Sequence, residues 1–211
     1  PESPVVPDRA EQGKREYGQV SGELESGYYA IRANGNTMYC TTNKTATDQC
    51  GASVSVSGGK LTMDGHPDCH VWLILKGQDG YTIQSMGGGG QYLSYGTVGQ
   101  YNHLPVSEDA AVFQITPEGD AYTISWTGES GETLYVSRGT TTGKEKWGTG
   151  TDAYPIELYQ ETAPEEPEAP EKPAAPDDLS VYIYPKASGA IEDGVYAIVG
   201  STVEKDTARP R

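Results

Sequence analysis

Basic side chains are scarce in this sequence. Among 211 residues, 15 Lys and Arg stand against 30 Asp and Glu, which gives a formal net charge of -15 at pH 7. No cluster of Lys or Arg relieves this charge locally, and an acidic surface repels phosphate backbones and anionic headgroups. No run of residues approaches the roughly 18 to 20 apolar positions that cross a bilayer. We therefore expect no nucleic-acid partner and no membrane insertion.

Signatures of catalysis are also missing. There is no Gly-x-Ser-x-Gly elbow, no glycine-rich phosphate loop ending in Lys and Ser or Thr, and no His-Glu-x-x-His. We expect neither enzymatic activity nor a cofactor. The segment from Asp64 to His70 holds two His, two Asp and one Cys, which are ligand types for zinc. Their spacing matches no standard site and Pro67 bends the segment, so we expect a turn there and no metal.

What the chain does contain is typical of an all-β protein. It has 27 Gly, 14 Pro and 15 Tyr but a single Phe, a composition of short strands joined by many turns. A Tyr-x-Ile motif begins at Tyr29, Tyr81 and Tyr122, and a second strand follows 10 to 13 residues later at Tyr39, Tyr92 and Tyr135. Each unit closes with a further strand: Trp72-Leu73-Ile74, Phe113-Gln114-Ile115 and Ile156-Glu157-Leu158. The runs Ser53 to Ser57, Leu104 to Val106 and the region of Trp147 supply the remaining strands, twelve in all.

Three pseudo-repeats of four strands resemble the β-trefoil, in which six strands close a barrel and six form a hairpin cap. The resemblance covers residues 27 to 159, and it is a resemblance both to trefoil lectins of the ricin B type and to fascin-like trefoils. It predicts a core of inward-facing residues: Tyr29, Ile31, Trp72, Ile74, Tyr81, Ile83, Leu93, Phe113, Ile115, Tyr122, Ile124, Leu134 or Val136, and Ile156 or Leu158.

The sugar site of the ricin-type family is not carried over. That family places an Asp just after the apolar residue of the second strand, where this chain has Thr41, Ser94 and Ser137. It also places a Gln two positions before the aromatic of the last strand, where this chain has His70, Ala111 and Tyr154. Because one trefoil scaffold serves many functions, the fold alone does not decide what the protein does.

Two features organise the rest of the chain. We expect residues 1–20 to be linker, 21–160 the trefoil domain, and 161–178 an extended polyproline II linker, because prolines recur every third residue from Pro164 to Pro176. Residues 179–211 begin a truncated second copy, because Ser21 to Ile31 recurs 167 residues later with seven of eleven positions identical. The parent protein is therefore expected to carry tandem copies of this domain.

Cys40, Cys50 and Cys69 permit one disulfide and leave one thiol. The acidic composition rich in Tyr, Thr and Gly indicates export to the cell surface or the extracellular space, where a bridge persists. Three pairings are possible. Pairing Cys50 with Cys69, or Cys40 with Cys50, would clip the long excursion in the first repeat. We predict one bridge among the three cysteines.

Aromatic residues in predicted loops suggest a shallow glycan site, since a ring can stack on a sugar and polar groups at its rim can bind hydroxyls. The candidate ligand-binding residues are Trp126, Glu129, Trp147, Tyr95, Tyr101, Asn102 and His103. Each Trp could instead be a barrel plug or a hairpin lid. We expect a non-catalytic binding module, with a glycan or other cell-surface ligand as its partner. A structural spacer that projects another domain, and a protease-inhibitor trefoil, are the alternatives.

Overall fold

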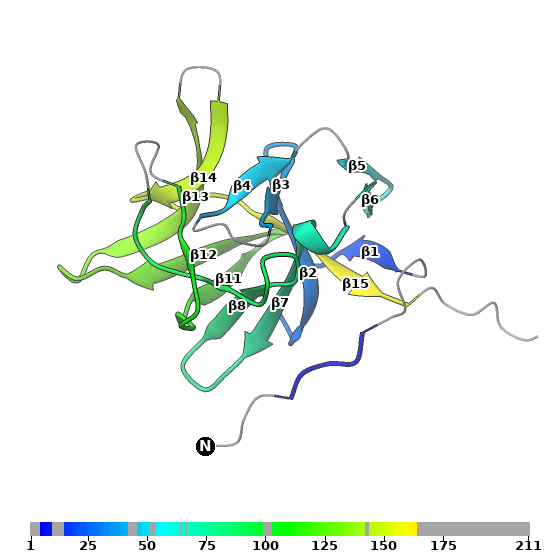
Figure 1. The fold of residues 1–211 in the computed structure, drawn as a ribbon, viewed down its shortest axis with the longest axis horizontal. Helices are drawn as coiled ribbons and strands as arrows, with labels where there is room; N and C mark the ends of the chain where they lie inside the picture. The colour runs from blue at the N-terminus through cyan, green and yellow to red at the C-terminus, as the bar shows by residue number, and fades with distance from the viewer. Residues whose placement is uncertain are drawn as a thin grey trace, which may run out of the picture. The chain divides into compact units, whose positions relative to one another are not determined.

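The computed structural model describes residues 5–9, 15–41, 46–50, 54–63, 65, 67–98, 103–141 and 144–163, with the backbone alone for 48–50, 139–141 and 144–145. All of these belong to one compact unit, Pro1–Glu165. The predicted second copy, residues 179–211, and the proline-rich linker from residue 164 onward lie outside the described residues. The described chain is all-β, as predicted, and its one helical element is the 3-10 turn η1 (Pro67–His70) (Figure 1).

Twelve strands fall into three units of four. The first unit contains β2 (Gly27–Ala33), β3 (Asn36–Tyr39), β4 (Asp48–Cys50) and β7 (Val71–Lys76). The second contains β8 (Tyr81–Ser85), β9 (Tyr92–Leu93), β10 (Val106–Ser107) and β11 (Gln114–Glu118). The third contains β12 (Ala121–Thr127), β13 (Thr133–Thr141), β14 (Lys144–Gly150) and β15 (Glu157–Thr162).

The first and last strands of the three units form a closed ring. Within each unit the Tyr of the Tyr-x-Ile motif lies opposite the first apolar residue of the closing motif: Tyr29 opposite Trp72, Tyr81 opposite Phe113, and Tyr122 opposite Ile156. Between units, β7 pairs with β8, β11 with β12, and β15 with β2. The ring therefore has six strands in the order β2, β7, β8, β11, β12 and β15. The same register recurs three times because the same sequence spacing recurs.

The second and third strands of each unit pair as hairpins: β3 with β4, β9 with β10, and β13 with β14. One assignment from the sequence is wrong. We predicted Ser53 to Ser57 as the third strand of the first unit, but β4 takes that place, and β5 (Val54–Ser57) forms a separate hairpin with β6 (Lys60–Met63). Gly58 and Gly59 both have positive φ, 56° and 74°, which a tight two-residue hairpin turn requires.

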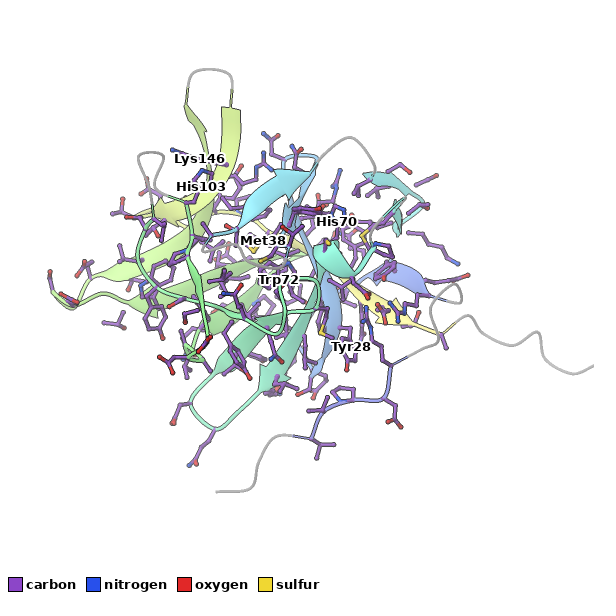
Figure 2. The ribbon with its side chains drawn as sticks, in the orientation of Figure 1. Tyr28, Met38, His70, Trp72, His103 and Lys146 are labelled. Carbon is purple, nitrogen blue, oxygen red and sulfur yellow. The ribbon has the colours of Figure 1, made fainter. Side chains whose placement is uncertain are left out.

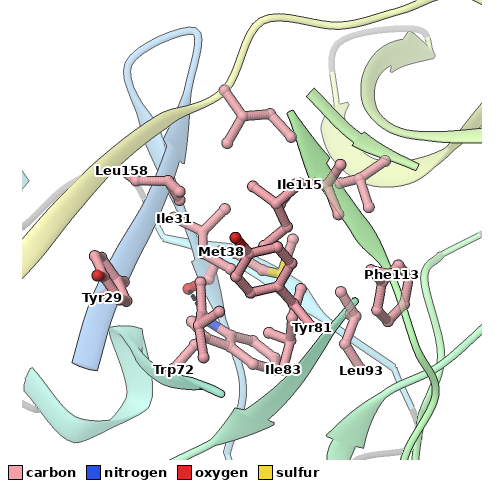
Figure 3. Close-up of a cluster of buried hydrophobic side chains, with 14 of the residues drawn as sticks. Tyr29, Ile31, Met38, Trp72, Tyr81, Ile83, Leu93, Phe113, Ile115 and Leu158 are labelled. Carbon is pink, nitrogen blue, oxygen red and sulfur yellow. Dashed lines mark hydrogen bonds between the residues drawn. The ribbon is translucent and has the colours of Figure 1, made fainter. Parts of the chain in front are cut away.

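The interior of the ring holds the predicted core. Every residue proposed for it is buried except Leu134, which is partly buried beside the fully buried Val136. Both Ile156 and Leu158 are buried, and Ile83 has no exposed surface. Figure 3 shows Tyr29, Trp72, Tyr81 and Phe113 converging with the aliphatic side chains between the strands. Met38 and Leu104 join this core from the hairpin side.

A second layer covers part of the outside of the barrel. Strand β1 (Glu16–Gln19) pairs with β15 on one side and β6 on the other. Beneath this layer lies a second apolar cluster: Tyr17, Tyr28, Ala30, Leu61, Val71, Leu73 and Tyr159. Residues Glu16–Gln19, which we assigned to a linker, are therefore part of the folded unit. The prediction missed this strand because four residues in a polar segment show little apolar alternation.

An ion network fastens the N-terminal segment to this layer. The Glu161 side chain is 1% exposed, and its carboxylate accepts hydrogen bonds from Arg9 Nε at 2.9 Å and from the Tyr17 hydroxyl at 2.8 Å. Arg15 lies 3.4 Å from the same carboxylate and also pairs with Asp68 at 2.8 Å. Burial, and then the bond to Glu161, raises the pKa of Tyr17 well above its usual value.

The predicted disulfide is not present. Cys40 and Cys69 are both thiols in this structure, and every pairing among the three cysteines would use at least one of them. Cys40 is fully buried in the core, with its Sγ directed at the carbonyl oxygen of Thr41, 3.7 Å away. It packs there as a small apolar residue. The side chain of Cys50 lies outside the described residues.

Candidate functional site

Trp126 is not in a loop, as the sequence suggested. It is on β12, opposite Leu134 of β13, and only 5% of it is exposed. Its position in the strand matches the alternation of Tyr122 and Ile124, so its side chain points into the core. There it stacks on Tyr95 with ring centroids 5.5 Å apart and meets Phe113 edge to face at 5.7 Å.

Trp147 is likewise buried, on β14, with the Arg138 guanidinium 5.5 Å from its ring centroid. Neither indole face is available to a ligand, so the expectation that these two rings are exposed is wrong. Trp126 plugs the barrel, and Trp147 packs beneath the β13–β14 hairpin, the alternative role raised for each. Polar neighbours in the sequence suggested a loop at Trp126 and an exposed ring at Trp147, whereas strand pairing continues through both positions.

Of the remaining predicted residues, Tyr95, His103 and Glu129 are among the described ones. Tyr95 is 42% exposed, and its hydroxyl donates to the Val112 carbonyl and accepts from the Val112 amide at 3.0 Å. His103 lies against β14, opposite Gly148 (Figure 2). Glu129 is exposed in the turn after β12, and Tyr101 and Asn102 lie outside the described residues. The structure thus brings Tyr95 to Trp126 and His103 to the strand of Trp147, and ligand binding by this group stays a prediction.

A pocket that sequence reasoning missed lies elsewhere on the barrel. Its volume is about 400 Å³, and it is lined by Gln19, Ala33, Asn34, Glu118, Asp120, Ala121, Tyr154, Pro155 and Glu157. These residues come from the end of β1, the β2–β3 turn, the β11–β12 turn and the segment that enters β15. The sequence singled out only Tyr154, as a departure from the ricin-type pattern.

Local sequence explains why these segments meet. Asn34 and Gly35 have φ of 46° and 78°, the left-handed pair that a two-residue turn between β2 and β3 requires. Across the pocket, the Gln19 side-chain amide donates to the Asp120 carbonyl at 3.2 Å and joins β1 to the β11–β12 turn.

Glu157 forms part of the pocket wall. Its carboxylate pairs with Arg32 and accepts a hydrogen bond from the Tyr159 hydroxyl at 3.0 Å. Burial, and then this hydrogen bond, raises the pKa of Tyr159 to about 12. The phenol therefore stays a donor to Glu157 at physiological pH. Glu157 is a fixed part of the wall, because both of its partners belong to the barrel strands β2 and β15.

The threefold repeat shows why the pocket is open. Counted four residues after the first-strand Tyr of each unit, the equivalent positions are Ala33, Ser85 and Trp126. Trp126 and Tyr95 fill the junction between the second and third units, where Val112 packs beside them. Ala33 occupies the same position at the junction between the third and first units, and its small side chain leaves the pocket.

The junction between the first and second units is filled in a different way. Here η1 packs directly on Gly87, so closely that an added Cβ would lie 2.4 Å from the Cα of Cys69. The Gly88 amide donates to the Ser85 hydroxyl at 2.9 Å and holds this turn against the barrel. In the described part of the chain, these contacts occupy two of the equivalent junctions, and the pocket lies at the third, beside Tyr154.

The described residues contain no group of three or more His, Cys, Asp or Glu arranged to hold a metal ion. Asp64 and His66, of the acidic and histidine-containing turn noted above, are not among them. Within the same ranges, no helix combines the length and the apolarity needed to cross a membrane. No protein-family model and no curated protein matches the sequence.

Proposed function

We propose that this chain is a non-catalytic carbohydrate-binding module of a secreted or cell-surface multidomain protein. The observation that carries the proposal is the open pocket beside Tyr154, at a junction whose two equivalents are filled. Its volume of about 400 Å³ is in the range of sites that take one small ligand. Its lining residues come from two turns and two strand ends, so the end of a longer glycan chain can reach it.

The fold that we propose for the module is the β-trefoil. Its support is the six-stranded ring, the three hairpins beside it, and the Tyr-to-closing-strand register that recurs in each unit. A pocket at a junction draws its lining from two neighbouring units, and the threefold repeat of this architecture supplies such junctions. The scaffold alone does not select a carbohydrate, which has to be argued from the side chains.

The chemistry of the lining suits a sugar. Tyr154 is half-buried and packs against the core, so its ring forms a firm apolar wall on which one face of a pyranose can stack. Glu118 and Asp120 are exposed at the rim, where their carboxylates can accept hydrogen bonds from ring hydroxyls. An apolar wall with a few polar groups beside it is the usual plan of a small-molecule site.

The points at which the chain enters and leaves the folded unit favour a binding module over a spacer. Glu16 in the first strand lies opposite Thr162 in the last, so the chain enters and leaves the unit at neighbouring points. Paired strands are about 5 Å apart, so one folded unit adds only about that much to the length of a stretched chain. Such a unit adds little to the length of the chain that carries it. Tandem copies would instead multiply the binding sites on one chain.

The test begins with a glycan array probed with the full chain, followed by calorimetric titration of the strongest ligand. Tyr154→Ala should weaken binding by at least about tenfold, because the stacking wall is lost. Tyr95→Ala is the matched control, an aromatic truncation at the filled junction, and it should leave affinity within about twofold. Circular dichroism of both variants checks that they are folded.

The opposite pattern, with Tyr95 essential and Tyr154 dispensable, would move the site to the residues chosen from the sequence. Failure of the array to show any bound glycan would overturn the proposal. Mass spectrometry of the recovered ligand tests the non-catalytic part, which predicts an unaltered glycan.

A further inference from the structure

The pocket beside Tyr154 is rich in hydrogen-bond acceptors. Three of its nine lining residues carry carboxylates: Glu118, Asp120 and Glu157. Glu157 is compensated by Arg32 and by the Tyr159 hydroxyl. Within the described part of the chain, the side chains of Glu118 and Asp120 make no hydrogen bond or ion pair, so both retain their full accepting capacity toward a ligand.

Cations are lacking on the same surface. No Lys, Arg or His lines the pocket, and its side-chain donors are the neutral amides of Gln19 and Asn34, of which Gln19 donates to the Asp120 carbonyl. Arg32, the cation in contact with the lining, is paired with Glu157. A ligand carboxylate or sulfate would find two uncompensated negative charges and no cationic partner, and the formal charge of -15 on the whole chain adds to this repulsion.

Building on the proposed carbohydrate-binding function, we propose that the pocket selects sugars that donate hydrogen bonds and carry no negative charge. Neutral hexoses meet both conditions, because their hydroxyls donate hydrogen bonds and they carry no charge. Amino sugars with a free ammonium group should bind more tightly, because the ammonium supplies three donors and a charge opposite to that of Glu118 and Asp120. Uronic acids, sialic acids and sulfated sugars are excluded.

The experiment uses the full chain and nine monosaccharides in three matched series. Glucose, glucosamine and glucuronate form the first, and the galacto and manno equivalents form the other two, so that only one substituent changes within a series. Dissociation constants come from NMR titration at low ionic strength. In the series that binds, the amino sugar should bind about fivefold more tightly than the neutral sugar, and the uronate at least about fivefold more weakly.

Two variants locate the selectivity. Glu118→Gln/Asp120→Asn removes both uncompensated charges at the pocket and should bring the amino and neutral sugars close to equal affinity. Glu108→Gln/Asp109→Asn, the matched control, removes two charges from exposed positions that do not line the pocket, and it should leave the ratio unchanged. Because all four substitutions are at exposed positions, both variants should fold. Raising the salt concentration should shrink the ratio in the parent chain and in the control variant, but not in the pocket variant.

A uronate that binds as tightly as its neutral partner would overturn the inference and leave the carbohydrate-binding function standing. An amino-sugar preference that survives Glu118→Gln/Asp120→Asn would also overturn it, since the selectivity would then arise elsewhere. Absence of binding across all nine sugars and the glycan array would instead remove the proposed function itself.

Discussion

Two equivalent junctions of the barrel are built from the same repeat and have opposite characters. Between the second and third units, the rings of Trp126 and Tyr95 stack with centroids 5.5 Å apart, and the Tyr95 hydroxyl is satisfied by the Val112 backbone. Between the third and first units, Ala33 and Tyr154 leave a pocket of about 400 Å³. In a repeated scaffold, therefore, a binding site can arise where one copy has a small side chain at a position that another copy fills with a large one, without any added reactive group.

The largest expected effect comes from truncating the ring that fills the closed junction. Trp126→Ala should lower the free energy of unfolding by about 3 to 5 kcal/mol, because it leaves a cavity among Tyr95 and Phe113. Tyr154→Ala at the open junction should cost far less, about 1 kcal/mol, because its ring is only half-buried. Urea denaturation measures both. Equal costs would mean that the two junctions are packed alike.

A larger side chain at the open junction should fill the pocket and make this junction resemble the closed one. In Ala33→Leu the added side chain can enter the pocket, so ligand affinity should fall by at least about tenfold while stability changes by less than about 1.5 kcal/mol. Calorimetric titration with the ligand found on the array, together with urea denaturation, gives both numbers. Undiminished affinity in a folded variant would show that the ligand binds outside this pocket.

The smallest effect concerns the third junction, where the residue equivalent to Tyr154 is His70. Its side chain is 2% exposed, its Nδ1 lies 2.7 Å from the Thr37 hydroxyl, and burial lowers its pKa below the usual 6.5. The folded state therefore keeps His70 neutral while the unfolded chain takes up a proton as the pH falls through about 6.5. This contribution to stability is present above that pH and is lost below it.

Between pH 7.5 and 5.5, unfolding free energy should accordingly decrease on acidification, with a slope of at most about 1.4 kcal/mol per pH unit from this group. His70→Gln should flatten the profile, and urea midpoints across the range measure it. A His70→Gln profile as steep as that of the parent chain would assign the slope to other groups.

Much of the barrel could be predicted from the sequence because it depends on local alternation. Tyr29 and Ile31, or Tyr81 and Ile83, are two residues apart and so point to one face of a strand, and matched spacing from Trp72 to Tyr81 and from Phe113 to Tyr122 fixes the pairing. The β5–β6 hairpin was misassigned because its alternation of Val and Ser resembles that of a barrel strand. Its Gly-Gly turn is what directs it outside.

The pocket could not be predicted in the same way. Its lining is drawn from positions as distant as Gln19, Asn34, Asp120 and Tyr154, which only the closed ring brings together. Its cause is the small size of Ala33, and a missing side chain leaves no motif. Trp126 and Trp147, which were proposed instead, were misread because a Trp beside polar residues in the sequence can lie either in a loop or at the buried end of a strand.

The central claim is that the ligand occupies the open junction, and backbone amide NMR of the full chain, titrated with the sugar identified on the array, tests it most directly. The amide signals of Asn34, Asp120 and Tyr154 should shift together and saturate with one dissociation constant, while those of Tyr95, His103 and Glu129 stay in place. Shifts confined to Tyr95, His103 and Glu129 would contradict the account and assign the ligand to the residues that were proposed from the sequence.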